Sequence, residues 1–246
     1  MQNKYVGDIG DFGKYELLRY LAKAQLPLGV NWYLTPDEEY CGDGRLTAYL
    51  NSGLMEDYDS DLFTRLYCLV KKERRNVREV ETSDILSADT AYYSRPLDWV
   101  QVTPENTRTA YRAAWHQSAL TAMKNSKLVF LDPDNGLQVK SVSPTSSKGN
   151  KYIAFEELKD YTQLGKSVVF YNHRERLQEN LYLDKFRKLR LDEAYQNLEW
   201  FGLKFSGGTV RDYIFLLQPD HAQAIISQCQ ALLGSKWRSH FSQLAL

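Results

Sequence analysis

The stretch that decides the fold of this chain is KLVFLDPDNG, residues 127–136. Its apolar part, Leu128 to Leu131, runs directly into two carboxylates, a proline, an amide and a glycine. A short apolar run bounded by turn residues is typical of a buried strand. An acid at the end of such a strand loses its hydration and therefore requires a partner or a function. We expect a buried strand at 127–132, followed by a turn that carries chemistry.

Helical and extended patterns alternate on both sides of this strand. Apolar residues at helical spacing predict helices at 14–25, 59–75, 103–126, 152–165, 175–199 and 220–234. Short β-branched and aromatic runs predict strands at 29–35, 76–82 and 166–175, and a hairpin within 203–219 that turns at Gly207 and Gly208. Residues 87–105 are predicted to be irregular, and the Ser-, Gly- and Lys-rich segment 141–151 to be a mobile surface loop.

This alternation predicts an α/β fold. We expect a mostly parallel sheet with helices on both faces and an antiparallel hairpin at one edge. The length of 246 residues is sufficient for one large core. We therefore expect a single domain at 1–246, with an irregular or helical insertion around 45–115.

The charge balance and the cysteines limit the classes of function. Lys and Arg together number 31, as do Asp and Glu, so no overall field attracts nucleic acid or a membrane, and any such contact requires a local patch. Cys41, Cys68 and Cys229 match no zinc or redox motif and fit a reducing compartment. The chain has neither a signal-peptide pattern nor an apolar run of membrane-spanning length. We expect a cytoplasmic protein that does not contact a membrane.

Several polar segments follow predicted strands. In open α/β sheets, ligands bind beyond the carboxyl ends of the strands. This rule brings four segments to one rim, namely 35–44, 82–86, 132–136 and 172–175. The side chains expected to share a crevice there are Asp37, Glu38, Asp84, Asp132, Asp134, Asn135 and His173. For Asp134 an ordinary turn is an equally good explanation, and a lone histidine such as His173 is more often structural than catalytic.

A second polar cluster is YVGDIGDFGKY, residues 5–15. Its three glycines precede a predicted helix, whose free N–H groups are suited to an anion, and glycine permits close approach. The spacing is not that of a phosphate-binding loop. The two aspartates would repel a phosphate and suit an amino group, a ribose hydroxyl or a metal. The alternative is a capped helix preceded by a flexible tail.

The order of these motifs resembles that of the bacterial 23S rRNA adenine-N6 methyltransferases of the RlmJ type. Gly7, Asp8, Asp11 and Lys14 occupy places of that family's H-x-G-N-x-A-D-x-x-K-H-like opening segment. NWYLTPDEEYCGDGR (31–45) is similar to its strand and glycine-containing loop, FLDPDNG (130–136) lies at the place of its D-P-P-Y motif, and VVFYNHR (168–174) lies at its next strand. Asp134 replaces the second proline and Asn135 the aromatic residue, for which Tyr171 and Tyr152 are candidate substitutes.

The resemblance implies a Rossmann-like methyltransferase-type sheet and an S-adenosylmethionine-dependent enzyme that methylates an amino group of a base in RNA or DNA. Asp132 would accept a hydrogen bond from the amine, and no metal would be required. The catalytic residues implied are Asp132, Pro133, Asp134, Asn135 and His173. The cofactor-binding residues implied are Gly7, Asp8, Asp11, Lys14, Thr35, Asp37, Glu38, Gly42 and Asp84.

A metal-dependent nuclease or phosphoesterase on the same scaffold is the alternative. Asp132 and Asp134, with Asp8 or Asp11 and His173, would hold Mg²⁺ through carboxylate oxygens. Lys151 or Arg174 would then steady a phosphate. The extra acid in DPDN favours this alternative, whereas the motif order favours methyl transfer. A binding module that has lost catalysis is a third reading.

Overall fold

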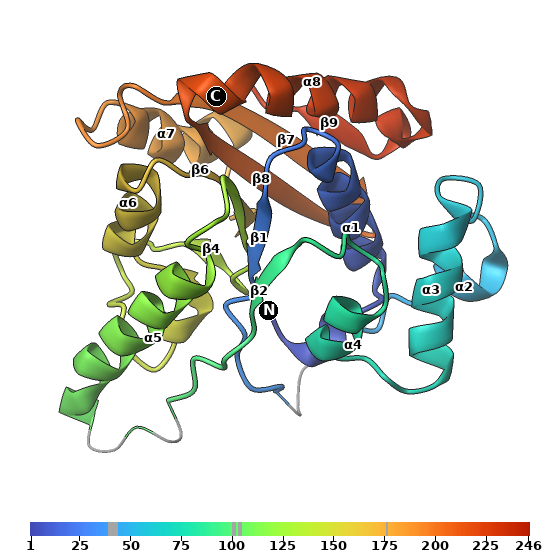
Figure 1. The fold of residues 1–246 in the computed structure, drawn as a ribbon, viewed down its shortest axis with the longest axis horizontal. Helices are drawn as coiled ribbons and strands as arrows, with labels where there is room; N and C mark the ends of the chain where they lie inside the picture. Colours follow the sequence, from blue (N-terminus) through green and yellow to red (C-terminus); the bar gives the residue numbers. More distant parts are fainter. Residues whose placement is uncertain (39–43, 100–101, 103–104, 176) are drawn as a thin grey trace.

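A computed structural model describes residues 1–38, 44–99, 102, 105–175 and 177–246 (Figure 1). Within these residues, seven strands form one sheet in the order β2-β1-β3-β6-β8-β7-β9. The strands are β1 (Leu28–Asn31), β2 (Ala91–Tyr93), β3 (Leu128–Leu131), β6 (Ser167–His173), β7 (Glu199–Gly207), β8 (Thr209–Leu217) and β9 (Phe241–Gln243). A separate small pair joins β4 (Gly136–Leu137) and β5 (Tyr152–Ile153).

The sheet combines a parallel part with an antiparallel edge. Strands β2, β1, β3 and β6 are parallel neighbours. Strand β8 is antiparallel to both β6 and β7, and β9 adds a further antiparallel pairing to β7. Gly208 turns the β7–β8 hairpin at a φ of 73°, a left-handed conformation that glycine adopts without strain. The predicted parallel sheet and closing hairpin are confirmed, while β9 was not predicted.

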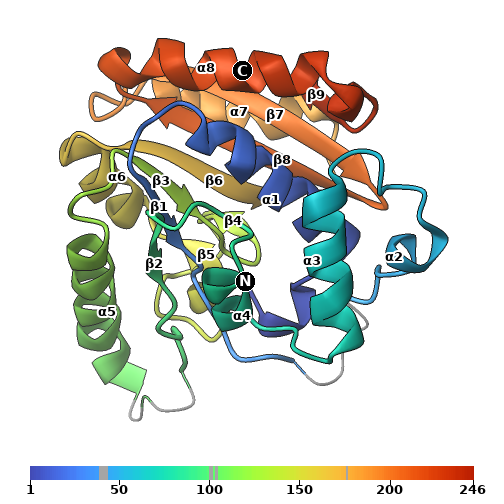
Figure 2. The same ribbon diagram turned by 45° about the vertical axis from the view of Figure 1, so that its right-hand side comes forward.

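Helices cover both faces of the sheet, as predicted. Alternate strand residues, among them Phe130, Val169 and Phe215, pack in one apolar cluster with α1 (Ile9–Ala22), α3 (Ser60–Lys71), α4 (Val77–Thr82) and α8 (Pro219–Gly234). Helices α1 and α8 lie side by side on this face (Figure 2). The intervening strand residues pack on the other face with α5 (Arg108–Ala122), α6 (Phe155–Gln163) and α7 (Glu179–Arg190).

The strand predicted at 76–82 is wrong, because these residues form α4. The Asn76 side chain caps this helix by accepting a hydrogen bond from the Glu79 N–H (3.0 Å), and Val77 and Val80 bury one face. The valines and Thr82 favour a strand by composition, but the cap and the i, i+3 spacing determine the outcome. The second strand of the sheet is instead β2, inside the segment expected to be irregular.

Other boundaries also differ from the predictions. Helix α5 begins at Arg108 after a short 3₁₀ turn, and residues 103–104, where the helix was predicted to begin, lie outside the described residues. The segment 45–115 contains α2 (Tyr49–Ser52), α3, α4 and β2. Cys68 and Cys229 are free thiols, and Cys41 lies outside the described residues. Across the described chain, no helix has the length and hydrophobicity that crossing a bilayer demands.

Arg112, a residue of α5, holds the loop at 141–151 through hydrogen bonds to its backbone. This buried side chain donates to the carbonyls of Pro144 (2.7 Å), Gly149 (2.7 Å) and Tyr152 (2.6 Å) and forms a bidentate pair with Glu157 (2.6 and 2.7 Å). All five N–H donors of the guanidinium are thereby used. Lys151, the last residue of the loop that the composition predicts to be mobile, lies between Gly149 and Tyr152, whose carbonyls Arg112 binds.

Candidate functional site

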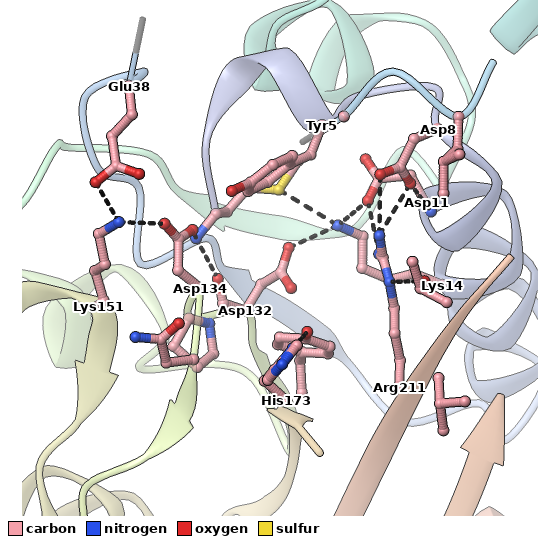
Figure 3. A pocket seen from close by; sticks show the side chains of 18 residues that line it. Tyr5, Asp8, Asp11, Lys14, Glu38, Asp132, Asp134, Lys151, His173 and Arg211 are labelled. Carbon is pink, nitrogen blue, oxygen red and sulfur yellow. Dashed lines mark hydrogen bonds and ion pairs between the residues drawn. The ribbon is translucent and has the colours of Figure 1, made fainter. Parts of the chain in front are cut away.

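A cavity of about 520 Å³ lies between the N-terminal end of α1 and the edge at which β3 and β6 end (Figure 3). We call it the site cavity. It lies near the point where the strand order reverses, because the chain passes from β1 to β2 on one side and later to β3 on the other. Such reversal points are where open α/β sheets bind ligands. The lining residues are Met1, Tyr5, Asp8, Asp11, Lys14, Glu38, Gly44, Leu46, Asp132, Pro133, Asp134, Asn135, Lys151, Tyr171, His173, Thr209, Val210 and Arg211.

The strand register places one row of polar side chains on the α1 face of the sheet. Leu131 pairs with Phe170, so the next residues, Asp132 and Tyr171, are neighbours at the ends of β3 and β6. His173 follows Tyr171 by two residues and pairs with Arg211 of β8. Side chains two residues apart on a strand share a face. The side chains of Asp132, Tyr171, His173 and Arg211 therefore lie on the face of the sheet that α1 covers.

The DPDNG turn is fixed by hydrogen bonds from both sides. The Asn135 N–H donates to the Lys151 carbonyl (2.9 Å), and the His173 N–H donates to the Asn135 carbonyl (3.2 Å). The Asn172 side chain accepts from the Leu137 N–H (3.0 Å). Gly136 has a φ of 104°, and a Cβ there would lie 2.2 Å from the Asn172 oxygen. Only glycine fits this position, because any side chain would clash with Asn172 and strain the backbone.

Lys14 connects α1 to Asp132. Its Nζ lies 2.8 Å from Asp11 Oδ1 and 2.7 Å from Asp132 Oδ2, and these side chains are almost fully buried. Burial opposes a charge on Lys14, but the charges of Asp11 and Asp132 outweigh it, so the pKa of Lys14 is raised. Lys14 is therefore an ammonium ion at neutral pH and a fixed partner for Asp132.

Arg211 holds the two aspartates of α1 from the hairpin. One guanidinium nitrogen donates to both oxygens of Asp8 (3.0 and 3.1 Å), and another lies 3.5 Å from Asp11 Oδ1. Burial raises the pKa of Asp8 above its ordinary value even though Arg211 lowers it. Burial also opposes the charge of Arg211, but Asp8, together with Tyr171 and Asp11, raises its pKa well above the ordinary value.

The glycines of the second cluster admit the hairpin. A Cβ on Gly10 would lie 1.8 Å from Arg211 Cζ, and one on Gly13 would lie 2.4 Å from the Phe205 ring. Two N–H groups at the start of α1 already have partners, because the Ile9 N–H donates to the Leu46 carbonyl (3.0 Å) and the Asp11 N–H to the Asp8 side chain (2.8 Å). The spacing of glycines therefore reflects close packing of α1 on β7 and β8.

We expect Gly10→Ala to displace the Arg211 side chain, because the methyl group and the guanidinium cannot share the space. Overpacking of this kind costs about 1–3 kcal/mol of unfolding free energy. The matched variant is Gly234→Ala at the end of α8, where an added Cβ meets no atom within 4 Å. Urea unfolding of both variants tests the expectation. Equal urea midpoints for the two variants would show that the Arg211 side chain does not need the space next to Gly10.

Asp134 is directed to a different set of cations from Asp132. Its carboxylate pairs with the Met1 ammonium (2.7 Å), accepts from the Gln2 amide (2.6 Å) and lies 3.8 Å from Lys151 Nζ. Burial alone would raise the pKa of Asp134, but the Met1 ammonium, Gln2 and Lys151 outweigh it, so the pKa is lowered. Lys151 also pairs with Glu38, on the same side of the cavity as Asp134 (Figure 3).

Most of the predicted site residues meet in the site cavity. Those that line it are Asp8, Asp11, Lys14, Glu38, Asp132, Pro133, Asp134, Asn135 and His173. Thr35 is buried beside it, with its hydroxyl 3.4 Å from Asp134. Gly7 and Asp37 do not line it. Gly7 contributes a left-handed turn before α1 (φ 84°), and Asp37 is exposed and accepts from the Lys4 N–H (3.3 Å). Gly42 lies outside the described residues.

The placement of Asp84 on the same rim is wrong. It lines a separate hollow with Glu16, Arg19 and Asp59, behind α1. The prediction placed Asp84 at the end of a strand, but the preceding residues form α4. The rule that ligands bind beyond the carboxyl ends of strands therefore does not apply to Asp84.

Several residues of the cavity were not predicted. Arg211, Tyr5, Leu46 and Val210 line it, and the only sequence signal is the charge of Arg211 and Asp212 in an otherwise apolar strand. Of the two candidate stacking tyrosines, Tyr171 lines the cavity and Tyr152 does not. Arg174, the candidate phosphate ligand, pairs with Asp212 instead (3.0 Å).

The acids of the cavity fit Mg²⁺ poorly. Mg²⁺ is bound through one or two carboxylates and several waters, and a carboxylate oxygen that already holds a protein cation is a weaker ligand for it. Here Asp132 is paired with Lys14, and Asp134 with Met1 and Lys151. In the part of the chain that the structure describes, no three His, Cys, Asp or Glu side chains are grouped to hold a metal ion.

Comparisons of the chain with protein-family models, curated proteins and solved structures find no match.

Proposed function

We propose that this chain is an S-adenosylmethionine-dependent methyltransferase that acts on an amino group of a nucleic-acid base, in RNA or DNA. The observation that carries the proposal is the position of Asp132. It ends the central parallel strand β3 and lines a cavity next to the reversal of strand order. A mostly parallel sheet that carries a C-terminal antiparallel hairpin is also what the motif order implies, and this supports the proposal.

The cavity suits a ligand that carries charges of both signs. Acids and cations alternate around it, with Asp8 and Arg211 on one side and Glu38 and Lys151 on the other (Figure 3). Glu38 and Asp8 are suited to an amino group or ribose hydroxyls, and Lys151 and Arg211 to a carboxylate. Leu46 and Val210 are partly exposed and provide an apolar surface beside these charges. The volume of the site cavity lies within the range of small-molecule sites, roughly 300–1,000 Å³.

The residues of the chain have separate tasks in this proposal. S-adenosylmethionine, when bound, supplies a methyl group on a positively charged sulfur. Asp132, held by the Lys14 ammonium at 2.7 Å, accepts a hydrogen bond from the substrate amine and orients its lone pair. Tyr171, the neighbour of Asp132 across the β3–β6 register, offers an aromatic surface that the DPDN turn lacks. His173 lies at hydrogen-bonding distance from the Tyr171 hydroxyl (3.3 Å).

Calorimetric titration with S-adenosylhomocysteine in EDTA tests the cofactor. We expect micromolar binding, about −8 kcal/mol, unchanged in Asp57→Asn, whose side chain is 90% exposed. A second titration with Mg²⁺ or Mn²⁺ alone tests the metal alternative. Metal binding without any nucleoside binding would contradict methyl transfer and require nuclease assays.

We expect Asp132→Asn to bind S-adenosylhomocysteine but to lose methyl transfer by about 100-fold, because the neutral amide orients the amine less well. Transfer of a radiolabelled methyl group to RNA and DNA pools measures this loss, with Asp57→Asn as the control. Equal transfer by wild type and Asp132→Asn would remove Asp132 from the reaction.

A further inference from the structure

The place of Lys14 is set by Asp11 as well as by Asp132. Asp11 is fully buried, and both of its carboxylate oxygens are engaged. Oδ1 lies 2.8 Å from Lys14 Nζ, and Oδ2 accepts from the Tyr15 hydroxyl at 3.0 Å. Because Tyr15 fixes the carboxylate from the other side, Asp11 offers one oxygen in one direction, toward Lys14.

Arg211 approaches the same acids from β8. It donates to both oxygens of Asp8 and lies 3.5 Å from the Asp11 oxygen that holds Lys14. Asp8 and Asp11 lie three residues apart, on one side of the start of α1, and their side chains are 4% and 0% exposed. Two buried carboxylates this close repel each other, and nearby cations reduce that repulsion.

We propose that Arg211 is a positioning residue that keeps the Lys14 ammonium on Asp132. By pairing with Asp8 and sharing Asp11, Arg211 limits the pull of these acids on Lys14, so that Lys14 keeps its contact with Asp132. Without Arg211, the uncompensated charge of Asp8 and Asp11 draws Lys14 toward α1 and away from Asp132. The importance of this arrangement for methyl transfer rests on the proposed function, but the arrangement itself can be measured without any ligand.

The Lys14 ammonium group offers a direct readout. Its nitrogen donates to Asp132 (2.7 Å) and to the Met1 sulfur (3.5 Å) and lies 2.8 Å from Asp11 Oδ1, so its hydrogens should exchange slowly with water and give a resolved NMR signal in protein labelled with ¹⁵N-lysine. The signal is assigned by its absence in Lys14→Arg. The test variants are Arg211→Gln, Arg211→Lys and the double variant Asp8→Asn/Arg211→Gln. Arg78→Gln, on the exposed side of α4, is the matched control.

We expect exchange in Arg211→Gln to be faster on the order of tenfold, intermediate in Arg211→Lys, and restored toward the wild-type rate in the double variant, where the uncompensated acid is gone. A purely structural role would not produce restoration by a second neutral substitution. Wild-type exchange in folded Arg211→Gln would overturn the proposal. If that variant does not fold, the double variant decides, and fast exchange in it would overturn the proposal. Failure of wild type to bind S-adenosylhomocysteine would count against methyl transfer alone, since the Lys14 signal needs no ligand.

Discussion

Replacing Arg112 by methionine is expected to lower the unfolding free energy by about 3–5 kcal/mol, the typical cost of breaking one side of a buried ion pair. Glu157 would remain buried with a charge whose main partner is gone. Three carbonyls, those of Pro144, Gly149 and Tyr152, would also lose their donor. Urea unfolding at pH 7 measures the loss.

The matched control is Arg78→Met, in which an exposed arginine is removed; it should change the unfolding free energy by less than about 0.5 kcal/mol. The double variant Arg112→Met/Glu157→Leu should recover part of the loss, because no unpaired charge is then buried. A loss of unfolding free energy below about 1 kcal/mol in Arg112→Met would mean that the Arg112 contacts together contribute little more than one average hydrogen bond.

The second large effect is a pH dependence that Glu16 confers on stability. Glu16 lies on α1 and is 4% exposed. Burial, followed by the hydrogen bond and the charge of Asp59, raises the pKa of Glu16 to about 8. The folded protein therefore keeps a proton that the unfolded chain releases above pH 4.5. The stability from this proton is fully present below that pH and is lost as the pH rises through about 8.

Glu16→Gln keeps the size and the donor of the protonated acid but cannot ionise. At pH 9 we expect it to be more stable than wild type by on the order of 3 kcal/mol, whereas near pH 4 the two should be similar. Melting temperatures from pH 4 to pH 9 test this, with the exposed Glu193→Gln as the control. Parallel curves for wild type and Glu16→Gln would show that Glu16 is already ionised in the fold.

Local patterns were sufficient for the strands and helices whose residues are apolar at a clear spacing. The strand at 127–132 and the hairpin at Gly208 could be predicted because burial and turn chemistry are encoded within about ten residues. Asp132 and its neighbours followed from the rule that ligands meet strand ends. The strand prediction at 76–82 was wrong because the valines of this segment fit a strand as well as they fit a short helix. Only the Asn76 cap distinguishes the two.

Long-range pairs could not be predicted. Arg211 and Asp8 are 203 residues apart in the sequence, and no spacing within either segment points to the other. The glycines at positions 10 and 13 resembled an anion site because glycine permits close approach of any group. Here the approaching groups are Arg211 and the Phe205 ring, whose identity depends on the assembled sheet.

The pairing of α1 with β8 also determines when the site can form. During synthesis, Asp8, Asp11 and Lys14 leave the ribosome long before Arg211. Asp8 and Asp11 at the start of α1 therefore stay in water until the β7–β8 hairpin, which carries Arg211, has been synthesised. Contacts of such sequence separation slow folding and leave partly folded chains exposed to aggregation. Ribosome-bound chains that stop before β8 should therefore carry Asp132 and Lys14 but no organised cavity.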